Sequence, residues 1–145
     1  MQQTEALSLT TPCVCFRVRK ASRALTRVYD EALAPAGLTV TQFSMLRNAM
    51  RIGRPTLNEL AEATGHERSA LWRTLQPLVR EGLMTLAPDK GQRADRVEVT
   101  DAGREAVEVG APLWEASQAR VRAKLGAENE AALIRMLGAV ERLAD

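Results

Sequence analysis

The sequence predicts a mainly α-helical fold with one small β-hairpin. Apolar residues recur at alternating spacings of three and four over most of the chain, which is the period of amphipathic helices. One stretch, residues 83–99, changes to alternating and β-branched residues and holds Pro88 and Gly91 near its middle, as a hairpin loop does. A chain of 145 residues can form one domain with its own hydrophobic core.

The first predicted helix covers about residues 12–34. Pro12 suits a first helical turn, and Pro35 ends the helical pattern. The apolar face carries Val14, Val18, Ala21, Leu25, Val28 and Ala32. The polar face is basic and carries Arg17, Arg19, Lys20, Arg23 and Arg27.

Two short helices with polar caps follow. The first covers about residues 42–51, with Thr39 or Thr41 as its cap. The second begins after Thr56, and Glu59 stands three residues beyond this cap, which is the spacing of a capping box. These caps satisfy backbone N–H groups that a first helical turn leaves without partners.

The fourth predicted helix, about residues 67–81, has a core face and a polar face. The core face carries Leu71, Leu75 and Leu78. The polar stripe carries Ser69, Arg73, Gln76 and Arg80. Gly82 ends the helix, and Pro77 predicts a kink because a proline removes one backbone hydrogen bond.

Two long helices complete the chain, at about residues 101–124 and 128–143. Gly110 and Pro112 predict an interruption of the first of them. Like the helix at residues 12–34, these helices cannot bury their apolar faces alone. We therefore expect the helices at the two ends of the chain to pack together as a dimerisation module.

A short helix, a turn containing glycine, a second helix and a hairpin form a helix-turn-helix with a wing, and we call residues 83–99 the wing. This motif places its second helix in the major groove of DNA, where Arg, Gln and Ser side chains hydrogen-bond base edges. The candidate major-groove residues are Arg68, Ser69, Trp72, Arg73 and Gln76. The candidate wing and phosphate contacts are Lys90, Arg93, Arg96 and Thr56.

Other interpretations of these residues stay open. An ordinary surface helix also has a solvated polar stripe, and Trp72 can pack instead of contacting a thymine methyl group. The predicted organisation is one domain, residues 1–145, with a DNA-binding region at about 38–100 and dimerisation helices at about 12–34 and 101–145.

Composition, charge and the absence of certain motifs argue against some classes of protein, among them membrane-spanning proteins. The net charge is only +2, so the positions of the basic residues matter more than their sum. No apolar run approaches the ~20 residues of a membrane span, and we expect a cytoplasmic protein. The sequence has no Gly-rich phosphate loop, no Ser/His/Asp cluster and no evident carboxylate pair, so we expect neither an enzyme nor a cofactor.

The two cysteines, Cys13 and Cys15, allow three interpretations: a metal site, a redox switch or two small packed side chains. Residues two apart on a helix point ~200° apart, so these thiols do not face one ion. A zinc site needs about four ligands, and the only histidine, His66, opens the fourth helix, so we predict no metal site. A disulfide between the two cysteines would require the start of the helix to unwind.

Three stretches together resemble the MarR family of winged helix-turn-helix repressors: AGLTVTQFSMLRNA (36–49), TLNELAEATGHERSALWRTLQPLVREGLM (56–84) and RADRVEVTDAGREAV (93–107). The resemblance covers about residues 13–143. It implies homodimers that bind pseudo-palindromic double-stranded DNA and leave it when a small ligand, often an aromatic carboxylate, binds. The family's wing motif Asp-x-Arg matches at Arg93, but Gly91 replaces the acid. Either Asp89 or Asp95 then forms the salt bridge of the wing, or the tip of the wing is looser in this chain.

Residues 15–29 also resemble the first helix of the family's organic-hydroperoxide sensors. Cys15 falls on the reactive position and Tyr29 on a tyrosine that hydrogen-bonds it, while Arg19 and Val40 replace two others. Three functions stay open: a repressor released by a small aromatic or anionic ligand, a peroxide sensor that acts through Cys15, and an interaction module without DNA binding. The candidate effector or redox residues are Cys15, Arg19, Tyr29 and Phe43.

Overall fold

The computed structural model of the chain describes residues 11–88 and 95–145. Most of them are helical, and one antiparallel hairpin forms the wing, so the predicted fold class is confirmed. In chain order the elements are α1 (Val14–Leu33), the 3-10 turn η1 (Ala34–Ala36), α2 (Val40–Ile52), α3 (Leu57–Thr64), α4 (Arg68–Arg80), β1 (Met84–Pro88), β2 (Asp95–Val99), α5 (Asp101–Leu125), α6 (Ala127–Glu141) and the 3-10 turn η2 (Arg142–Ala144).

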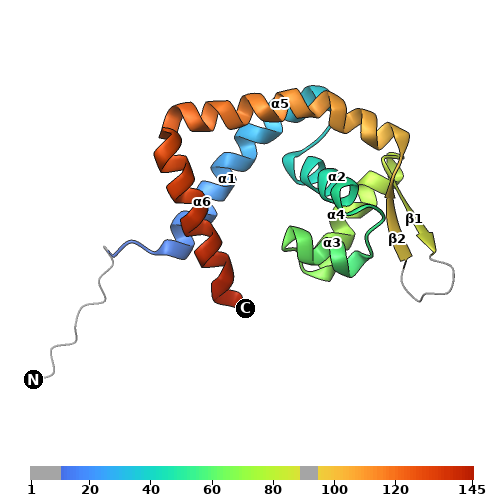
Figure 1. Cartoon of the computed structure of the whole chain (residues 1–145), viewed down its shortest axis with the longest axis horizontal. Helices are drawn as coiled ribbons and strands as arrows, with labels where there is room; N and C mark the ends of the chain where they lie inside the picture. Colours follow the sequence, from blue (N-terminus) through green and yellow to red (C-terminus); the bar gives the residue numbers. More distant parts are fainter. Residues whose placement is uncertain (1–10, 89–94) are drawn as a thin grey trace, which may run out of the picture.

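The long helix α5 connects two groups of elements (Figure 1). One group consists of α1 and α6, which both contact α5. The other group consists of α2, α3, α4 and the wing, which pack together near the N-terminal end of α5. The helix-turn-helix and the wing thus form one compact unit, and α5 extends from it to the helices at the two ends of the chain.

The hydrophobic core lies between α2, α4, the wing and the first half of α5. The leucines predicted on the core face of α4 are all buried, with Leu71 and Leu78 at 0% exposure and Leu75 at 1%. They belong to one cluster with Phe43, Met45, Leu46, Ala49, Leu60, Met84 and Val97. Full burial of one such side chain stabilises the fold by about 1.5–3 kcal/mol, so the leucine face holds α4 against α2.

The wing is anchored at its base to the segment before α3. Its register pairs Met84 with Val99 and Pro88 with Asp95. On the other edge of β2, the Val97 N–H donates to the Pro55 carbonyl at 2.8 Å, and Thr56 forms an antiparallel bridge with Arg96. Strand β2 is therefore held on both edges, by β1 and by the chain that enters α3.

Threonine caps begin α2 and α3, and the structure selects Thr39 over Thr41 as the cap of α2. The Gln42 N–H donates to Thr39 Oγ1 at 3.2 Å, and the Thr39 N–H donates to Gln42 Oε1 at 3.0 Å. Thr56 and Glu59 form the same reciprocal pair at α3, as the sequence predicts.

We expect Thr39→Ala to lower the free energy of unfolding by about 1 kcal/mol, because alanine removes the Oγ1 that accepts from the Gln42 N–H. Chemical denaturation monitored by circular dichroism measures the change. Thr41→Ala is the matched control, since Thr41 is exposed and lies inside α2. Equal losses in the two variants would contradict the assignment of the cap.

Helix α5 is continuous across Asp101–Leu125, so the predicted interruption near Gly110 and Pro112 is wrong. Gly110 is buried, and a Cβ atom built on it would lie 3.1 Å from two ring carbons of Phe43. This glycine therefore allows α5 to pack closely on α2. The one hydrogen bond missing at Pro112 is tolerated because packing, more than propensity, stabilises a helix in a folded protein. Helix α4 continues through Pro77, as its leucine spacing predicted.

The first turn of α5 packs directly on the chain that enters β1. Thr100 caps the helix: its Oγ1 accepts from the Gly103 N–H at 3.1 Å and donates to the Gly82 carbonyl at 2.6 Å. A Cβ atom on Gly103 would overlap the Leu83 carbonyl oxygen and lie 2.7 Å from Val99 Cγ1. The close approach of α5 to the wing therefore requires glycine at this position.

Candidate nucleic-acid interface

Helix α4 presents a polar face to solvent on the side away from its leucines. The five candidate major-groove residues are all exposed on this helix or at its start: Arg68, Ser69, Trp72, Arg73 and Gln76. Trp72 is 43% exposed, so its indole ring is not held in the core. Within residues 11–88 and 95–145, no carboxylate forms an ion pair with Arg68 or Arg73. Both guanidinium groups are thus available to an anionic partner.

The turn between α3 and α4 sets the direction of α4. Helix α3 ends at Gly65, whose φ of 73° lies in the left-handed region that glycine adopts without strain. The His66 N–H donates to the Ala61 carbonyl at 3.1 Å, and His66 Nδ1 lies 3.0 Å from Thr64 Oγ1. Because α2 packs against both α3 and α4, the helix-turn-helix is fixed as a unit.

The loop of the wing lies outside the described residues. Four positions of the sequence analysis fall in this loop: Asp89, Lys90, Gly91 and Arg93. Asp95, the other candidate for the salt bridge of the wing, is exposed at the start of β2 and forms no ion pair with another described residue. The DNA contacts of Lys90 and Arg93 therefore stay predictions.

Arg96 and Thr56 lie at the base of the wing and not at its tip. Arg96 Nη1 donates to the Arg54 carbonyl at 3.2 Å and lies 3.6 Å from Glu59 Oε2. Thr56 is half-buried, and its Oγ1 accepts from the Glu59 N–H at 3.1 Å. The role that the structure gives to Thr56 is therefore helix capping, with its hydroxyl hydrogen still able to donate.

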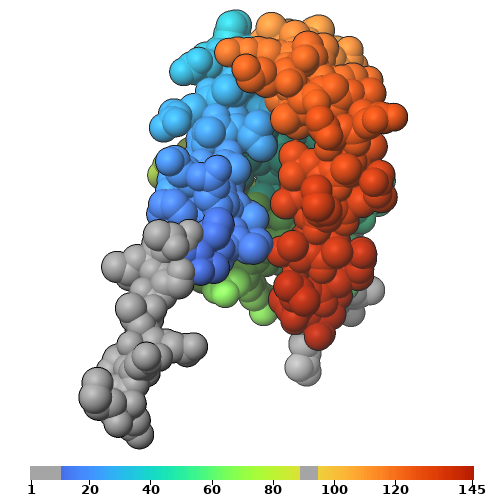
Figure 2. All heavy atoms as spheres, turned by 90° about the vertical axis from the view of Figure 1, so that its left-hand side faces the viewer, coloured from blue at the N-terminus to red at the C-terminus, as the bar shows by residue number. Residues whose placement is uncertain are grey.

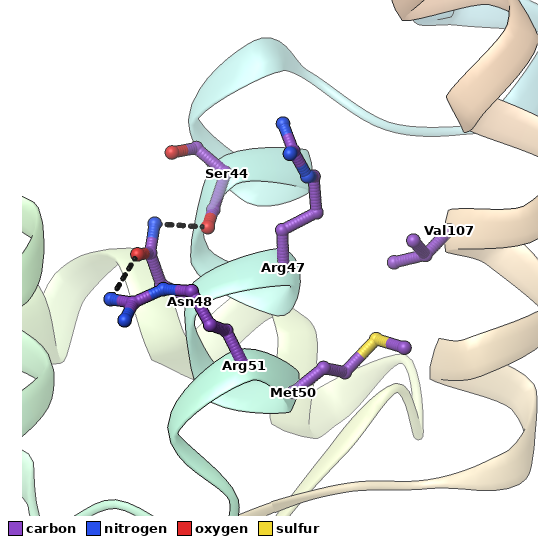
Figure 3. A pocket seen from close by; sticks show the side chains of 6 residues that line it. All are labelled: Ser44, Arg47, Asn48, Met50, Arg51 and Val107. Atoms are coloured by element: carbon purple, nitrogen blue, oxygen red, sulfur yellow. Dashed lines mark hydrogen bonds between the residues drawn. The ribbon is translucent and has the colours of Figure 1, made fainter.

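A pocket of about 450 Å³ lies between α2 and α5 (Figure 3). Its walls are formed by Ser44, Arg47, Asn48, Met50, Arg51 and Val107. The Arg47 guanidinium lies over two aromatic rings, 4.3 Å from the Trp114 centroid and 5.6 Å from the Phe43 centroid, so its position is set in the free protein. Arg51 Nη2 donates to Asn48 Oδ1 at 3.2 Å. The two cations suit an anionic group, and the apolar side chains of Met50 and Val107 on the same pocket suit a ring.

Arg47 and Arg51 were not predicted as site residues. Their spacing of four within a predicted helix places them on one face, and this spacing is the signal that the sequence carried. Nothing in the sequence indicated that α5 would lie across that face at Val107 and Trp114, because this contact joins segments about sixty residues apart.

A second hollow, of about 640 Å³, forms a groove between α1 and α6 (Figure 2). Its apolar lining includes Val18, Leu25, Val40, Leu133 and Leu137. Tyr29 also lines this groove, whereas Cys15 and Arg19 are exposed nearer the start of α1. Phe43 is buried in the core at 1% exposure. The structure therefore does not bring the four candidate effector residues together in one site.

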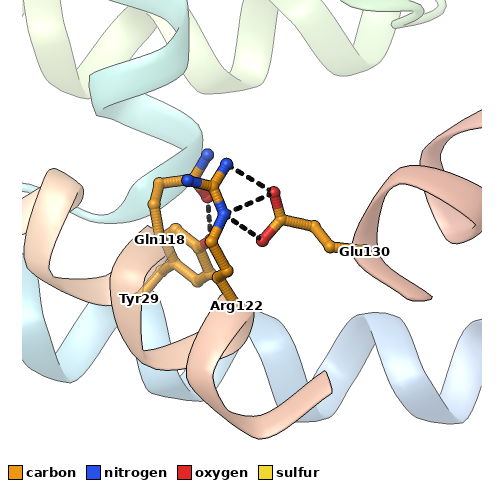
Figure 4. Close-up of polar contacts among 4 residues, drawn as sticks. All are labelled: Tyr29, Gln118, Arg122 and Glu130. Atoms are coloured by element: carbon orange, nitrogen blue, oxygen red, sulfur yellow. Dashed lines mark hydrogen bonds and ion pairs between the residues drawn. The ribbon is translucent and has the colours of Figure 1, made fainter. Parts of the chain in front are cut away.

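Tyr29 belongs to a polar cluster where α1, α5 and α6 meet (Figure 4). Its hydroxyl donates to Gln118 Oε1. Beside it, Arg122 holds the Glu130 carboxylate through Nε and Nη2, at 2.9 to 3.2 Å. Burial, and next the negative charge of Glu130, raise the pKa of Tyr29 above its ordinary value.

We expect the tyrosinate absorbance of the chain to titrate above pH 10, because its single tyrosine is Tyr29 and the folded pKa is raised. The neutral phenol is favoured in the folded state, so its contribution to stability is present below the unfolded pKa of about 10 and is lost as the pH rises through the folded pKa. The stability difference between wild type and Tyr29→Phe should therefore shrink in this alkaline range. A titration midpoint at or below 10 would contradict the environment of Tyr29.

Both cysteines are exposed free thiols at the start of α1. Cys13 caps the helix, with its Sγ accepting from the Phe16 N–H at 3.5 Å, so α1 begins two residues later than predicted. Cys15 lies in the first helical turn. In the part of the chain that the structure describes, no group of three or more His, Cys, Asp and Glu side chains could hold a metal ion, and no helix is long and apolar enough to cross a membrane.

Comparison with solved structures gives relatives that match over most of the chain. The transcriptional regulator MosR of M. tuberculosis, solved in complex with DNA, is 37% identical, with a TM-score of 0.84 over 92% of this chain and 96% of MosR. A second MosR structure gives 36% identity and a TM-score of 0.77, covering 90% of this chain and 96% of that one. No protein-family model and no curated protein sequence matched.

Two further structures share the fold at lower identity. The repressor CouR bound to p-coumaroyl-CoA is 24% identical, with a TM-score of 0.82 over 90% of this chain and 92% of CouR. A mutant MarR from E. coli, complexed with operator DNA, is 24% identical, with a TM-score of 0.79 over 87% of this chain and 91% of MarR. The identity with MosR, the shared fold and the order of helix-turn-helix, wing and long α5 agree with the resemblance seen in the sequence. The chain belongs to the MarR family of transcriptional regulators.

Proposed function

We propose that the chain is a homodimeric repressor that binds a pseudo-palindromic operator in double-stranded DNA. The observation that carries the proposal is the exposed polar face of α4, whose Arg68 and Arg73 have no carboxylate partner among the described residues. Such a face on the second helix of a helix-turn-helix, beside a wing, suits the major groove. The complex of its relative MosR with DNA supports the same role.

The apolar surface of α1 and α6 supports the dimer. Large apolar side chains are exposed on these two helices, including Phe16 at 57%, Ile134 at 63% and Met136 at 59%. Helix α6 has no buried residue in the single chain, and an apolar helix surface of this kind indicates a protein partner. Light scattering tests this point: the expected mass is twice the 15.9 kDa of one chain, and a mass of one chain at micromolar concentration would contradict the dimer.

A DNA-binding titration tests the proposed function. The probe is a labelled duplex from the region flanking the chain's own gene, and the control is a scrambled duplex of equal length and composition. We expect tighter binding to the flanking duplex, by at least about a thousandfold if the site is a true operator. No binding to either duplex at low salt would favour an interaction module that does not recognise DNA.

We further propose that an aromatic carboxylate releases the chain from DNA by binding in the pocket at Arg47 and Arg51. An occupant would contact both α2 of the DNA-binding unit and α5, and can therefore change how the two are placed if it binds one arrangement better. The p-coumaroyl-CoA bound by CouR also combines an aromatic ring with anionic groups, although these are phosphates and its carboxyl group is a thioester.

The matched pair Arg47→Gln and Arg19→Gln locates the effector site. We expect benzoate or 4-hydroxybenzoate to release DNA from the Arg19 variant as from wild type, and to release it poorly from the Arg47 variant. The reverse result would move the site to the start of α1, where Arg19 is exposed.

A second candidate for the release mechanism is oxidation of Cys15, as the resemblance to organic-hydroperoxide sensors suggests. The thiol is exposed in the first turn of α1, and a peroxide would convert it to a sulfenic acid while its O–O bond breaks and an alcohol leaves. We expect this mechanism to be abolished in Cys15→Ser and retained in Cys13→Ser, with DNA binding measured before and after cumene hydroperoxide. Release that survives Cys15→Ser would exclude Cys15 as the sensor.

A further inference from the structure

Four charged residues meet at the base of the wing, between β2, the turn after α2 and the first turn of α3: Arg54, Glu59, Arg96 and Glu98. Arg54 Nε pairs with Glu98 Oε1, and Arg96 pairs with Glu59. The Arg96 side chain is 23% exposed, the least exposed of the four, whereas that of Arg54 is 58% exposed. The cluster joins three elements that are separate in sequence.

Arg96 contacts the chain that enters α3 through two described residues, Arg54 and Glu59. Its Nη1 donates to the Arg54 carbonyl at 3.2 Å and lies 3.6 Å from Glu59 Oε2. The same Glu59 oxygen accepts from the Thr56 N–H at 3.2 Å, as part of the capping box of α3. One carboxylate thus connects the cap of α3 with the guanidinium of β2.

The turn before α3 is shaped to receive this guanidinium. Arg54 has a φ of 50°, in the left-handed region that side chains other than glycine seldom adopt, and it follows Gly53 at 75°. The free-energy cost of such a backbone conformation is on the order of that of losing one hydrogen bond, and the conformation persists where surrounding contacts stabilise it. Here the Arg54 carbonyl accepts from Arg96, and its side chain pairs with Glu98.

We propose that Arg96 is a positioning residue, which holds the wing against the start of α3 and so sets where the wing meets DNA, and that Glu59 is its partner in this role. The sequence placed Arg96 among the phosphate contacts of the wing. Its inward hydrogen bond, its low exposure and its carboxylate partner favour the positioning role. The proposal rests on the proposed function, because its main readout is DNA binding.

The two roles predict opposite results for Glu59→Gln. If Arg96 contacts a DNA phosphate directly, removal of a carboxylate beside it strengthens binding to the DNA polyanion. If Arg96 positions the wing through Glu59, the same change weakens binding. Glutamine keeps the capping box, because its side-chain oxygen can still accept from the Thr56 N–H, so the variant removes the charge of the pair and little else.

The experiment compares operator binding by wild type, Glu59→Gln, Arg96→Gln and the control Glu62→Gln across a range of salt concentrations. Glu62 is an exposed carboxylate on the same helix, so its variant measures the general effect of removing one negative charge. We expect Glu59→Gln and Arg96→Gln to weaken binding by at least about threefold, with the salt dependence unchanged. If Arg96 instead bound a phosphate group, Arg96→Gln would lower the slope of log K against log salt by about 0.9.

A second measurement needs no DNA. The Val97 N–H, which donates to Pro55 at 2.8 Å, reports whether β2 is docked on the chain before α3. We expect its hydrogen-exchange protection to fall in Glu59→Gln and Arg96→Gln and to stay at the wild-type value in Glu62→Gln. Unchanged protection, tighter binding by Glu59→Gln, or a reduced salt slope for Arg96→Gln would each overturn the positioning role. Failure of the wild type to bind any duplex would instead reject the proposed function and leave the exchange result as the test of the contact.

Discussion

Gly103→Ala is expected to destabilise the fold by about 2 to 3 kcal/mol, even though it replaces a helical glycine by the best helix former. Alanine gains about 1 kcal/mol of helix propensity over glycine. Against this, its Cβ atom would overlap the Leu83 carbonyl oxygen and lie 2.7 Å from Val99 Cγ1. A backbone carbonyl cannot move aside as the end of a flexible side chain can, so the steric cost exceeds the gain and α5 must shift from the wing.

Gly138→Ala gives the matched comparison with the opposite expected sign. This glycine lies within α6, and among the described residues of one chain a Cβ atom there would meet only Arg142 Nη1, at 3.6 Å, an ordinary contact. We expect it to raise stability by about 0.5 to 1 kcal/mol. Both changes are measured by urea unfolding at one fixed protein concentration, because a dimer's stability depends on concentration. A stabilising Gly103→Ala would show that α5 and the wing do not approach each other as described.

Arg73→Ala is expected to weaken operator binding by about 1 to 3 kcal/mol, which is roughly fivefold to 150-fold, with a loss of base preference at one position of each half-site. Arg73 is exposed on α4 four residues after Ser69, on the stripe that suits the major groove. An arginine that reads a guanine donates to O6 and N7 together, so its removal affects sequences that carry this guanine more than others.

The measurement is a set of binding titrations with duplexes that differ at single base pairs. Lys124→Ala controls for the loss of one positive charge, because Lys124 is exposed in the last turn of α5. This end of α5 lies away from α4 (Figure 1). Arg93→Ala is expected to weaken binding to all duplexes alike and to reduce the salt slope, as a wing contact with phosphate would. Equal losses on all duplexes for Arg73→Ala would show that this residue binds phosphate and does not read a base.

Local patterns in the sequence predicted the elements and the orientation of α4. The leucine spacing of α4, the threonine caps of α2 and α3 and the change of period at the wing are each decided by neighbours within a few residues. For the same reason, the sequence could predict that the five candidate major-groove residues, from Arg68 to Gln76, are exposed together.

Contacts between distant segments could not be predicted in this way. From the sequence, Gly110 is predicted to break the helix. In the structure, a Cβ atom added to it would lie 3.1 Å from the Phe43 ring, so the glycine is needed for close packing. From the sequence, Arg96 is predicted to be a surface cation of the wing. In the structure, it lies beside Glu59 and the Arg54 carbonyl. The pocket at Arg47 exists only because α5 crosses α2. These three features depend on tertiary contacts between distant segments. The composition and periodicity of one segment do not show which other segment will pack against it.

The continuity of α5 gives the molecule a lever arm. Its 25 residues form a rod about 37 Å long, with α6 at one end, the wing at the other and α1 packed against its middle, from Gly110 to Gln118. A tilt of about 5° at the end near α6 would displace the wing end by about 3 Å, and no break at Gly110 or Pro112 would absorb the movement. Operator half-sites are spaced by whole turns of the DNA helix. In a dimer, a displacement of this size in each subunit would therefore prevent the two α4 helices from entering successive major grooves together.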